Sequence, residues 1–453
     1  MDVGVIGLGV MGENLILNIE EKGFNVSIYN RTTTKTDNLI EKHKNLNLLG
    51  CKDLKSFVDS LSSPRKIILL IKSGNPVDAM IDKLVPYVNK EDVIIDAGNS
   101  FYEDTERRSL KYENIFSFLG VGISGGELGA RHGPSIMVGG CKKGWEIIKP
   151  IFEKIAAKAD DISCCAYFGN TSSGHFVKMV HNGIEYCEMQ LLCEVYFLFK
   201  KSKLNTQKIT KILKKWLKTE ELESYLLEIT TKILDRDDEL INKVLDAASQ
   251  KGTGMQCVST ALNFGSINTM MSDSVFARII SSKKTLRTVL FEKYGNKIDE
   301  NIVIEENCVK NAFTLAKAVA YVQGYVFMLE VSKIKNWNIN IKEVSQIWKN
   351  GCILRGGFLQ TMIKMETDGI LLKNDTFKQI YENGFEDLKY VLKCAIDKNL
   401  PMPCFSSALN YLNGMIIKDG SGNLIQALRD CFGSHTVQLE GSDEFVHIDW
   451  LNW

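Results

Sequence analysis

A short polar stretch between positions 178 and 186 could carry acid–base chemistry. It contains Lys178, His181, Asn182, Glu185 and Tyr186, which fall on one arc of a helix, roughly 140° wide at about 100° per residue. The opposite arc is apolar and holds Val177, Val180, Ile184, Cys187 and Leu191. Any surface helix has a polar face, but this one combines a potential base, a potential acid, an amide and a phenol. We therefore expect it to form one wall of an active site.

A glycine-rich loop near the amino terminus has the features of a dinucleotide-binding turn. The residues Gly7, Leu8, Gly9, Val10, Met11 and Gly12 follow an apolar strand (Val3–Ile6) and open a helix. The glycines allow a tight turn and let the backbone approach a pyrophosphate at the positive end of the helix. This context favours a dinucleotide cofactor over a plain glycine turn.

The end of the second strand distinguishes NADP from NAD. An NAD site usually has a carboxylate there, which accepts hydrogen bonds from the ribose 2′-hydroxyl. Here the chain has Asn30, Arg31 and Thr32, and the first carboxylate is Asp37. Arg31 could stack on adenine and bind a 2′-phosphate, with Asn30 and Thr32 adding donors. The sequence favours NADP, and the alternative is a surface arginine at this position.

Polar residues also follow the later strands. Lys72 comes after the third strand and Asn99 after the fourth, at the edge where ligands bind in a doubly wound sheet. Simple turn chemistry is the alternative for both. After the fifth strand, Ser124, Gly125 and Gly126 suit a carboxylate or a polyol. A nucleophilic serine is not expected, because no hydrolase-like His–Asp pair accompanies it.

Several cations farther along the chain could bind a phosphate. Lys251 and Thr253 lie on a glycine turn, Arg278 follows an apolar run, and Arg429 and His435 lie near the carboxyl end. Individually each could belong to a surface ion pair, and spacing alone does not show that they converge.

The first 172 residues alternate apolar strands with helix-like segments. The expected strands are Val3–Ile6, Val26–Tyr29, Ile67–Ile71, Val93–Asp96 and Phe116–Val121, extended by Ile136–Val138 and Ile162–Phe168. Between them lie amphipathic stretches such as Asn14–Glu21 and Val77–Val88. This alternation predicts an α/β Rossmann-type domain with a mostly parallel sheet, spanning residues 1–172.

The rest of the chain is predicted to be helical. None of the seven prolines falls between Pro150 and Pro401, and proline is the strongest helix breaker. We expect a large all-α domain at residues 173–418. It contains a weak internal echo, in which the striped helices Phe176–Phe199 and Ala312–Val331 are each followed by a tryptophan, Trp216 or Trp348. A duplicated unit and chance recurrence both remain open as explanations.

A short tail at residues 419–453 closes the chain. It carries Phe445, Trp450 and Trp453, and such an aromatic terminus is expected to dock on something. Another subunit is one possibility.

Composition limits the class of protein. The 453 residues hold 55 basic and 55 acidic side chains, so no overall charge favours nucleic acid or a membrane surface. No signal peptide or apolar run of membrane-spanning length is visible. The 12 cysteines lack metal-ligand spacing, so we expect reduced thiols, a cytoplasmic location and no metal.

Taken together, these motifs resemble the decarboxylating 6-phosphogluconate dehydrogenases over nearly the whole chain. The most specific parts of the resemblance are residues 7–12, 30–32, 124–126, 178–186, 251–254 and 429–435. It implies a Rossmann-type domain, an all-α domain built from a duplicated unit, and a tail that reaches the partner subunit of a homodimer. The implied reaction, in the oxidative branch of the pentose phosphate pathway, converts 6-phospho-D-gluconate and NADP to D-ribulose 5-phosphate, CO2 and NADPH.

The resemblance also implies residue roles. Lys178 would be the general base for the 3-hydroxyl, and Glu185 the acid that protonates C1 of the enediol. Substrate carboxylate and hydroxyls would contact Asn99, Ser124, Gly125, Gly126, His181 and Asn182. The phosphate end would contact Tyr186, Lys251, Thr253 and Arg278, with Arg429 and His435 from the other subunit. The cofactor would contact residues 7–12 and 30–32, Lys72 and Asn99.

A few positions depart from the family pattern. Gly9 replaces the usual Ala, Ala97 the usual Gly, Met255-Gln256 the usual Lys-Trp, Cys431 the usual Tyr and Cys187 the usual Gly. None removes a proposed catalytic group, but they leave packing and affinity beside the phosphate open.

The rival functions are a hydroxyacid dehydrogenase for an unphosphorylated substrate and a catalytically silent NADP-binding protein. The first would not need Lys251, Arg278 or the tail, and the second predicts loss of Lys178 and Glu185.

Overall fold

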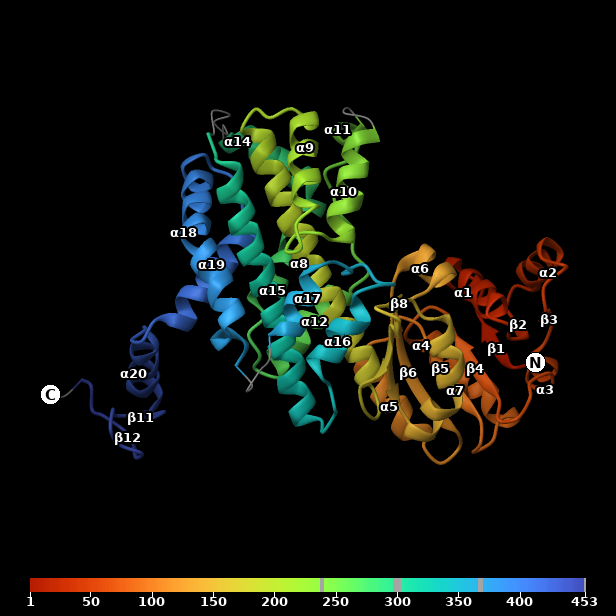
Figure 1. Ribbon diagram of the computed structural model, residues 1–453. Helices are drawn as coiled ribbons and strands as arrows, with labels where there is room; N and C mark the ends of the chain where they lie inside the picture. Colours follow the sequence, from red (N-terminus) through yellow and green to blue (C-terminus); the bar gives the residue numbers. More distant parts are fainter. Residues whose placement is uncertain (237–239, 296–302, 366–369, 452–453) are drawn as a thin grey trace.

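The computed structural model describes residues 1–236, 240–295, 303–365 and 370–451. An α/β part at the amino-terminal end is followed by a larger helical part, and the carboxyl-terminal segment projects from the helices (Figure 1). The fold class predicted from the sequence is therefore confirmed.

The α/β part is built on one eight-stranded sheet in the order β10-β7-β6-β5-β4-β1-β2-β3. Its strands are β1 (Val3–Ile6), β2 (Val26–Tyr29), β3 (Leu48–Cys51), β4 (Lys66–Leu69), β5 (Val93–Asp96), β6 (Ser117–Ile123), β7 (Ile136–Gly140) and β10 (Cys165–Tyr167). All neighbours pair in parallel except β6 and β7. Strands β1, β5 and β6 are buried along their whole length, as expected where helices cover both faces of a sheet.

Two apolar cores lie on the two faces of the sheet. On one face, α1 and α7 contribute Leu15, Ile16 and Phe152. On the other, α3 and α4 contribute Phe57 and Ile81. The helices of this part are α1 (Val10–Glu21), α2 (Thr33–Lys42), α3 (Leu54–Asp59), α4 (Asn75–Leu84), α5 (Tyr102–Tyr112), α6 (Gly126–His132) and α7 (Lys142–Ile155), with the short 3-10 helix η1 (Val85–Tyr87).

Two details differ from the sequence-based expectation. Strand β3 was not predicted. It lies at the edge of the sheet, and only Cys51 of its four residues is buried. The expected single strand over 162–168 is divided: β9 (Ile162–Ser163) pairs with β8 (Lys158–Ala159) in a separate hairpin, and β10 alone joins the sheet. The positive φ angles of Asp160 and Asp161 form the tight turn between β8 and β9.

Strand β1 lies between β2 on one side and β4 on the other. The chain therefore leaves β1 at the point where the strand order reverses, which is where dinucleotides bind in this class of sheet. The loops after β1, β4, β5 and β6 all emerge at the same edge, because these strands are parallel.

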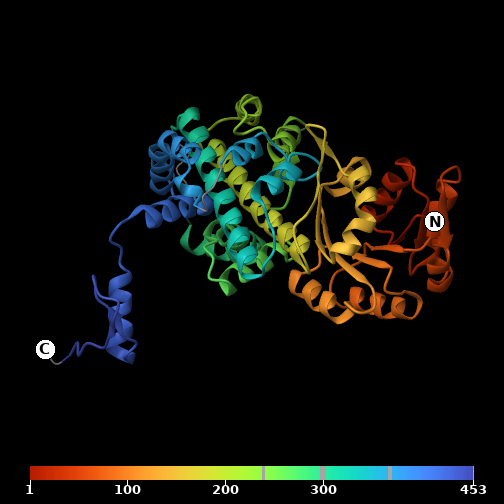
Figure 2. The ribbon, with the colours of Figure 1, turned by 60° about the horizontal axis from the view of Figure 1, so that its bottom comes forward.

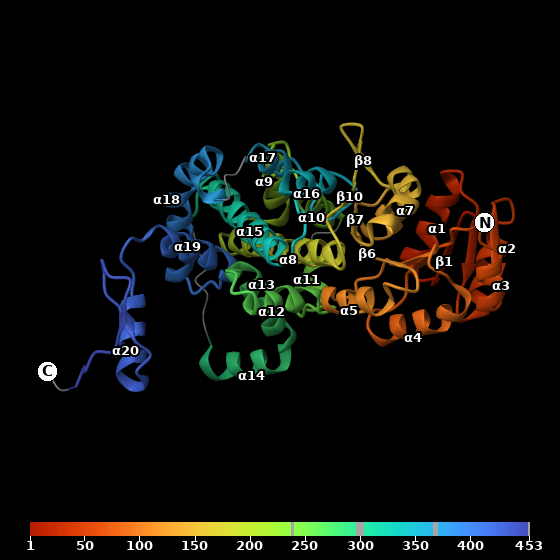
Figure 3. The ribbon, with the colours of Figure 1, turned by 90° about the horizontal axis from the view of Figure 1, so that it is seen from below.

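The helical part surrounds two long helices of 29 residues each, α8 (Ser173–Lys201) and α15 (Glu306–Ile334). The others are α9 (Thr206–Trp216), α10 (Tyr225–Arg236), α11 (Leu240–Lys243), α12 (Thr253–Asn263), α13 (Thr269–Ser282), α14 (Lys284–Tyr294), α16 (Ile341–Trp348), α17 (Phe358–Lys364), α18 (Asp375–Asp397) and α19 (Pro403–Ile416), with the 3-10 helix η2 (Leu371–Lys373). Seen from below, α14 projects away from the body of the helices (Figure 3).

The internal echo in the sequence corresponds to two similar helical units. Each long helix is followed by a shorter one that ends in a buried tryptophan, Trp216 in α9 and Trp348 in α16. The units also touch directly, since Ser224 and Gly356 form an antiparallel bridge. These parallels agree with a duplicated unit, which stays a prediction.

Helix α15 is long and apolar enough to cross a membrane by length and composition, but 83% of its most apolar window is buried inside the structure. That is the ordinary condition of a core helix, so it is weak evidence for a membrane span.

The tail forms a small folded unit that stands clear of the helical part (Figure 2). It consists of α20 (Gly422–Gly433) and the antiparallel pair β11 (Val437–Gln438) and β12 (Phe445–Val446). Asp430 lies at its centre, fully buried, and accepts hydrogen bonds from His447 Nδ1 at 2.9 Å and Trp450 Nε1 at 2.8 Å. Backbone N–H groups of Thr436 and Ile448 donate to the same carboxylate.

Candidate active site

The polar face of α8 meets the loop after β6. Lys178 is only 7% exposed, and its Nζ donates a hydrogen bond to Ser124 Oγ at 3.0 Å. The fully buried His181 lies beside both, with Nε2 3.3 Å from Ser124 Oγ and Nδ1 3.4 Å from Lys178 Nζ. Asn182 and Glu185 continue the row, at 3.3 Å and 3.8 Å from His181 Nδ1. The face predicted to form a site wall is thus one connected polar cluster.

Close backbone approach holds this cluster together. A Cβ on Gly122 would lie 2.3 Å from Lys178 Cβ, so β6 and α8 can touch only because position 122 has no side chain. Gly174, at the start of α8, packs equally closely on the carbonyl of Gly120 and the amide of Gly139. These contacts fix the height of Lys178 above the sheet edge.

The second helical unit supports the site, which the sequence did not indicate. The ring of Trp348 meets the His181 ring edge-on, with centroids 5.1 Å apart. The carbonyl of Gly351 accepts a hydrogen bond from Ser135 N at 2.8 Å and lies 2.5 Å from where a Cβ on Gly125 would be. Gly125 has φ +105°, so the turn after Ser124 requires glycine both for its backbone angle and for space.

Burial changes the acid–base properties of the cluster. It lowers the pKa of Lys178 below the usual 10.5, although the charge of Glu185 acts in the opposite direction. It raises the pKa of Glu185 above the usual 4.5, against the effects of Lys178 and Arg278. Burial and the neighbouring Lys178 also lower the pKa of His181 well below 6.5. Both shifts are toward the forms that a base and an acid need, a neutral lysine and a protonated carboxyl.

Farther along α8, Tyr186 and Arg278 form a second group. The Arg278 guanidinium carbon lies 3.5 Å from the centre of the Tyr186 ring. The ring also packs against α12, where a Cβ on Gly254 would come within 2.6 Å of it. Lys251 and Thr253 lie at the amino-terminal end of α12, so the structure brings four of the predicted phosphate-end residues to one side of α8.

The glycine loop fits a dinucleotide. Gly7 has φ +112°, and a Cβ there would lie 2.3 Å from the Leu70 carbonyl. A Cβ on Gly12 would lie 2.1 Å from the Gly7 carbonyl. The loop runs through Leu8 and Gly9 into α1, which begins at Val10 and includes Met11. The backbone N–H groups in the first turn of α1 have no acceptor within the helix, and this is where a pyrophosphate binds.

After β2, Asn30 is hydrogen-bonded to the glycine loop, whereas Arg31 and Thr32 are exposed. The Leu8 N–H donates to Asn30 Oδ1 at 3.1 Å, and Asn30 Nδ2 donates to the Thr32 carbonyl at 3.0 Å. The Asn30 amide therefore ties the glycine loop to β2, rather than being a free donor as the sequence suggested. Arg31 and Thr32 are exposed beside it, at the place where a 2′-phosphate would lie.

Lys72 and Asn99 are exposed on neighbouring loops of the same edge. Arg429 and His435 are also exposed. They belong to the tail, whose helix α20 projects away from α8 of the same chain (Figure 1). Within one chain, then, the structure joins Ser124 to the polar face of α8 and Arg278 to Tyr186, and it places the tail residues elsewhere.

The fold and the cluster define a dinucleotide-dependent dehydrogenase with a lysine and a carboxylic acid at its centre. Two family models match: the NAD binding domain of 6-phosphogluconate dehydrogenase over residues 2–169 and the 6-phosphogluconate dehydrogenase C-terminal domain over residues 174–450.

Individual relatives agree over the full length. The decarboxylating 6-phosphogluconate dehydrogenase of Aggregatibacter actinomycetemcomitans is 42% identical over 99% of this chain and 96% of its own length. The NADP(+)-dependent enzyme of Bacillus subtilis is 41% identical over 99% of both chains. The solved 6-phosphogluconate dehydrogenase of Plasmodium falciparum, studied with NADP+ and with 6-phosphogluconate, superposes with a TM-score of 0.94 at 37% identity, covering 99% of this chain and 100% of that one. The chain belongs to the 6-phosphogluconate dehydrogenase family.

Proposed function

We propose that this protein catalyses the oxidative decarboxylation of 6-phospho-D-gluconate to D-ribulose 5-phosphate and CO2, reducing NADP to NADPH. The observation that carries the proposal is the Lys178–His181–Glu185 cluster, in which Lys178 and His181 are buried and Glu185 is partly buried. Removal from water lowers the pKa of the lysine and raises that of the carboxyl. Relatives that match along the whole chain bear the name of this activity.

The proposed chemistry uses Lys178 in three proton transfers. Its neutral amine takes the proton of the substrate 3-hydroxyl. NADP, held by the glycine loop, would supply the acceptor for the hydride that leaves C3. The product is a β-keto acid, and the C1–C2 carbon–carbon bond then breaks because the ketone accepts its electrons. The Lys178 ammonium donates its proton to the developing oxyanion, giving an enediol.

Glu185 completes the reaction. Its protonated carboxyl donates a proton to C1 of the enediol, which was C2 of the substrate before CO2 left. Lys178 takes back the hydroxyl proton as the ketone of the product forms. Lys178 thus ends the step as an ammonium and Glu185 as a carboxylate, and proton exchange resets the pair. The raised pKa of Glu185 supports this role because a carboxyl must hold its proton near neutral pH to donate it.

The surrounding residues are assigned to binding. Ser124, Gly125, Gly126, His181, Asn182 and Asn99 hold the carboxylate and hydroxyl end of the substrate. Tyr186, Lys251, Thr253 and Arg278 hold the phosphate end. The glycine loop, Arg31, Thr32 and Lys72 bind NADP, with Asn30 fixing the loop.

We further propose a cytoplasmic homodimer in which the tail of one subunit completes the site of the other. Arg429 and His435 of each chain would then reach the partner's phosphate site. The tail's position away from the helical part (Figure 2) and its exposed aromatic residues support this arrangement. The corresponding domain bounds are 1–172, 173–418 and 419–453.

One assay tests the central proposal. NADPH formation is followed by absorbance with 6-phosphogluconate, with unphosphorylated gluconate and NAD as controls, in the wild type and in Lys178→Met. We expect activity with the phosphorylated substrate and NADP, and its loss in the variant. An inactive wild type refutes the function, an active variant refutes the role of Lys178, and a preference for NAD refutes the role of Arg31.

A further inference from the structure

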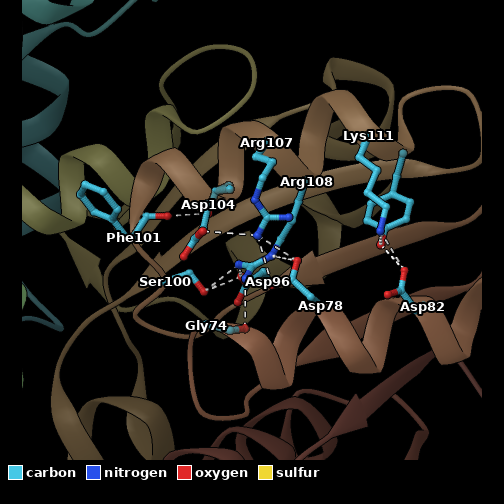
Figure 4. Close-up of polar contacts among 12 residues, drawn as sticks. Gly74, Asp78, Asp82, Asp96, Ser100, Phe101, Asp104, Arg107, Arg108 and Lys111 are labelled. Carbon is cyan, nitrogen blue, oxygen red and sulfur yellow. Dashed lines mark hydrogen bonds and ion pairs between the residues drawn. The ribbon is translucent and has the colours of Figure 1, made fainter.

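Arg108 lies fully buried below the cofactor edge of the sheet, on α5. Its guanidinium makes five hydrogen bonds (Figure 4). The acceptors are the carboxylate of Asp78, which receives two of them, the carboxylate of Asp96, the hydroxyl of Ser100 and the carbonyl of Gly74. An arginine side chain has five N–H donors, so donors and acceptors match in number.

Through Asp96, this arginine holds the loop that carries Asn99. Arg108 Nη1 is 3.2 Å from Asp96 Oδ2. The same carboxylate accepts hydrogen bonds from Gly98 N at 3.2 Å and from Ser100 Oγ at 2.6 Å. Gly98 and Ser100 are the two neighbours of Asn99, so Asp96 fixes the backbone on either side of it.

Through Gly74 and Asp78, the same guanidinium holds the loop that carries Lys72. Arg108 Nη2 donates to the Gly74 carbonyl at 3.1 Å, just two residues after Lys72. Nε and Nη2 bind Asp78 in the first turn of α4 at 3.0 and 2.8 Å. Gly74 has φ +86°, a conformation that other residues rarely adopt, so the contact with Arg108 holds an unusual turn two residues after Lys72.

The cluster extends to a second arginine. Arg107 also binds Asp78, at 3.0 and 3.1 Å, and Asp104, at 3.3 Å. Two arginines and three carboxylates therefore form one network, and Arg108 is its only member that contacts both loops among the hydrogen bonds described above.

We propose that Arg108 is a positioning residue that sets the relative placement of Lys72 and Asn99 for the cofactor and the substrate. The inference rests on the proposed function, since it takes Lys72 and Asn99 to contact these ligands. One buried side chain then links the loop after β4 to the loop after β5, both at the carboxyl edge of the sheet.

The test is Arg108→Lys, which keeps the charge but cannot make the forked contacts. We expect the Kd for NADP, measured by calorimetry, and the KM for NADP to rise roughly 10- to 100-fold, the effect of a misplaced ligand group. The fall in kcat should be much smaller, because Lys178 and Glu185 are not displaced. Ser100→Ala, which removes only the hydroxyl contacts, should raise the same Kd by a few-fold.

The chain offers a matched control. Arg65 binds Asp92 at 3.1 Å and joins the same two strands, β4 and β5, at their opposite edge. Arg65→Lys should lower the melting temperature without changing the Kd for NADP. An unchanged Kd in Arg108→Lys, or an equal rise in Arg65→Lys, overturns the proposal. If Arg108→Lys does not fold, an unchanged Kd for NADP in Ser100→Ala overturns the proposal instead. Turnover by the wild type with its phosphorylated substrate tests the proposed function separately.

Discussion

Lys178 belongs to α8 and lies where this helix touches β6 through Gly122. An ammonium group is poorly solvated there. The pKa of Lys178 is lowered mainly by burial, so the folded chain holds the Lys178 proton less tightly than the unfolded chain does. A group of this kind opposes folding. The side chain is therefore expected to serve chemistry at the expense of stability.

The first prediction follows from this penalty: Lys178→Met should abolish turnover and raise the free energy of unfolding by roughly 0.5–2 kcal/mol, as other strained active-site groups do when replaced. The penalty is complete below the folded-state pKa of Lys178 and disappears above the ordinary 10.5. The gain of the variant should thus be largest at low pH and shrink as the pH rises. Urea unfolding at several pH values measures it. A variant less stable than the wild type at neutral pH would contradict the prediction.

The second prediction concerns the pH dependence of kcat. The pKa of Lys178 is lowered from 10.5 and that of Glu185 is raised from 4.5, so both limbs of the profile should lie inside this interval. Glu185→Gln should slow turnover about 100-fold or more, the usual contribution of a general acid, and should remove one limb. A profile of the variant with both limbs unchanged would show that Glu185 does not titrate in catalysis.

At the scale of elements, two glycines of the same loop, Gly9 and Gly12, differ in the space around them. A Cβ on Gly12 would lie 2.1 Å from the Gly7 carbonyl, whereas a Cβ on Gly9 has nothing within 4 Å. Gly9 also has an ordinary φ of −83°. Only Gly12 is required by the packing of α1 against the loop.

The third prediction compares these positions. Gly12→Ala should push α1 from β1, weaken NADP binding at least 10-fold and destabilise the protein by about 1–3 kcal/mol, as overpacking does. Gly9→Ala should leave NADP binding within a few-fold and stabilise the fold by roughly 0.4–1 kcal/mol. Titration with NADP and thermal unfolding of both variants give the comparison. Equal losses in both would mean that the cofactor itself, not α1, needs the space.

The elements also show which features a sequence can reveal. The glycine loop and the polar face of α8 could be predicted because each is a local pattern within one turn or one helix. Arg108 could not, because its partners Asp96, Asp78 and Gly74 lie 12, 30 and 34 positions away. Trp348 and Gly351 reach the site from the second helical unit for the same reason. The family and the fold class predicted from the motifs are confirmed, whereas the residue roles and domain bounds stay predictions.

At the scale of the whole molecule, the tail is folded but poorly supported by its own chain. Hydrogen bonds to the buried Asp430, led by the backbone of Ile448 and the side chain of His447, outweigh its burial and lower its pKa. One face of α20, formed by Leu424, Ile425, Leu428 and Phe432, is exposed. A preformed unit with an exposed apolar face is suited to docking on another subunit, where its flanking Arg429 would face a substrate phosphate.

The fourth prediction tests this exchange by complementation. Arg429→Ala alone should raise the KM for the phosphorylated substrate by at least 10-fold, because a charged hydrogen-bonding partner of the phosphate is lost. Lys178→Met alone should be inactive. The two chains, coexpressed with different tags and purified as a mixed dimer, should recover about half of the wild-type activity at low substrate concentration. In that dimer one site is intact, because its Lys178 and the Arg429 of the partner subunit are both unchanged.

The other site of the mixed dimer carries both substitutions and contributes nothing. If each tail instead served its own subunit, every site would contain one substitution and the mixed dimer would have no more activity than the separate variants. A double variant of one chain paired with a wild-type chain provides the control. With exchanged tails each of its sites lacks one group, so it should be nearly inactive at low substrate concentration, whereas tails that stay with their own subunit would leave its wild-type site at about half activity.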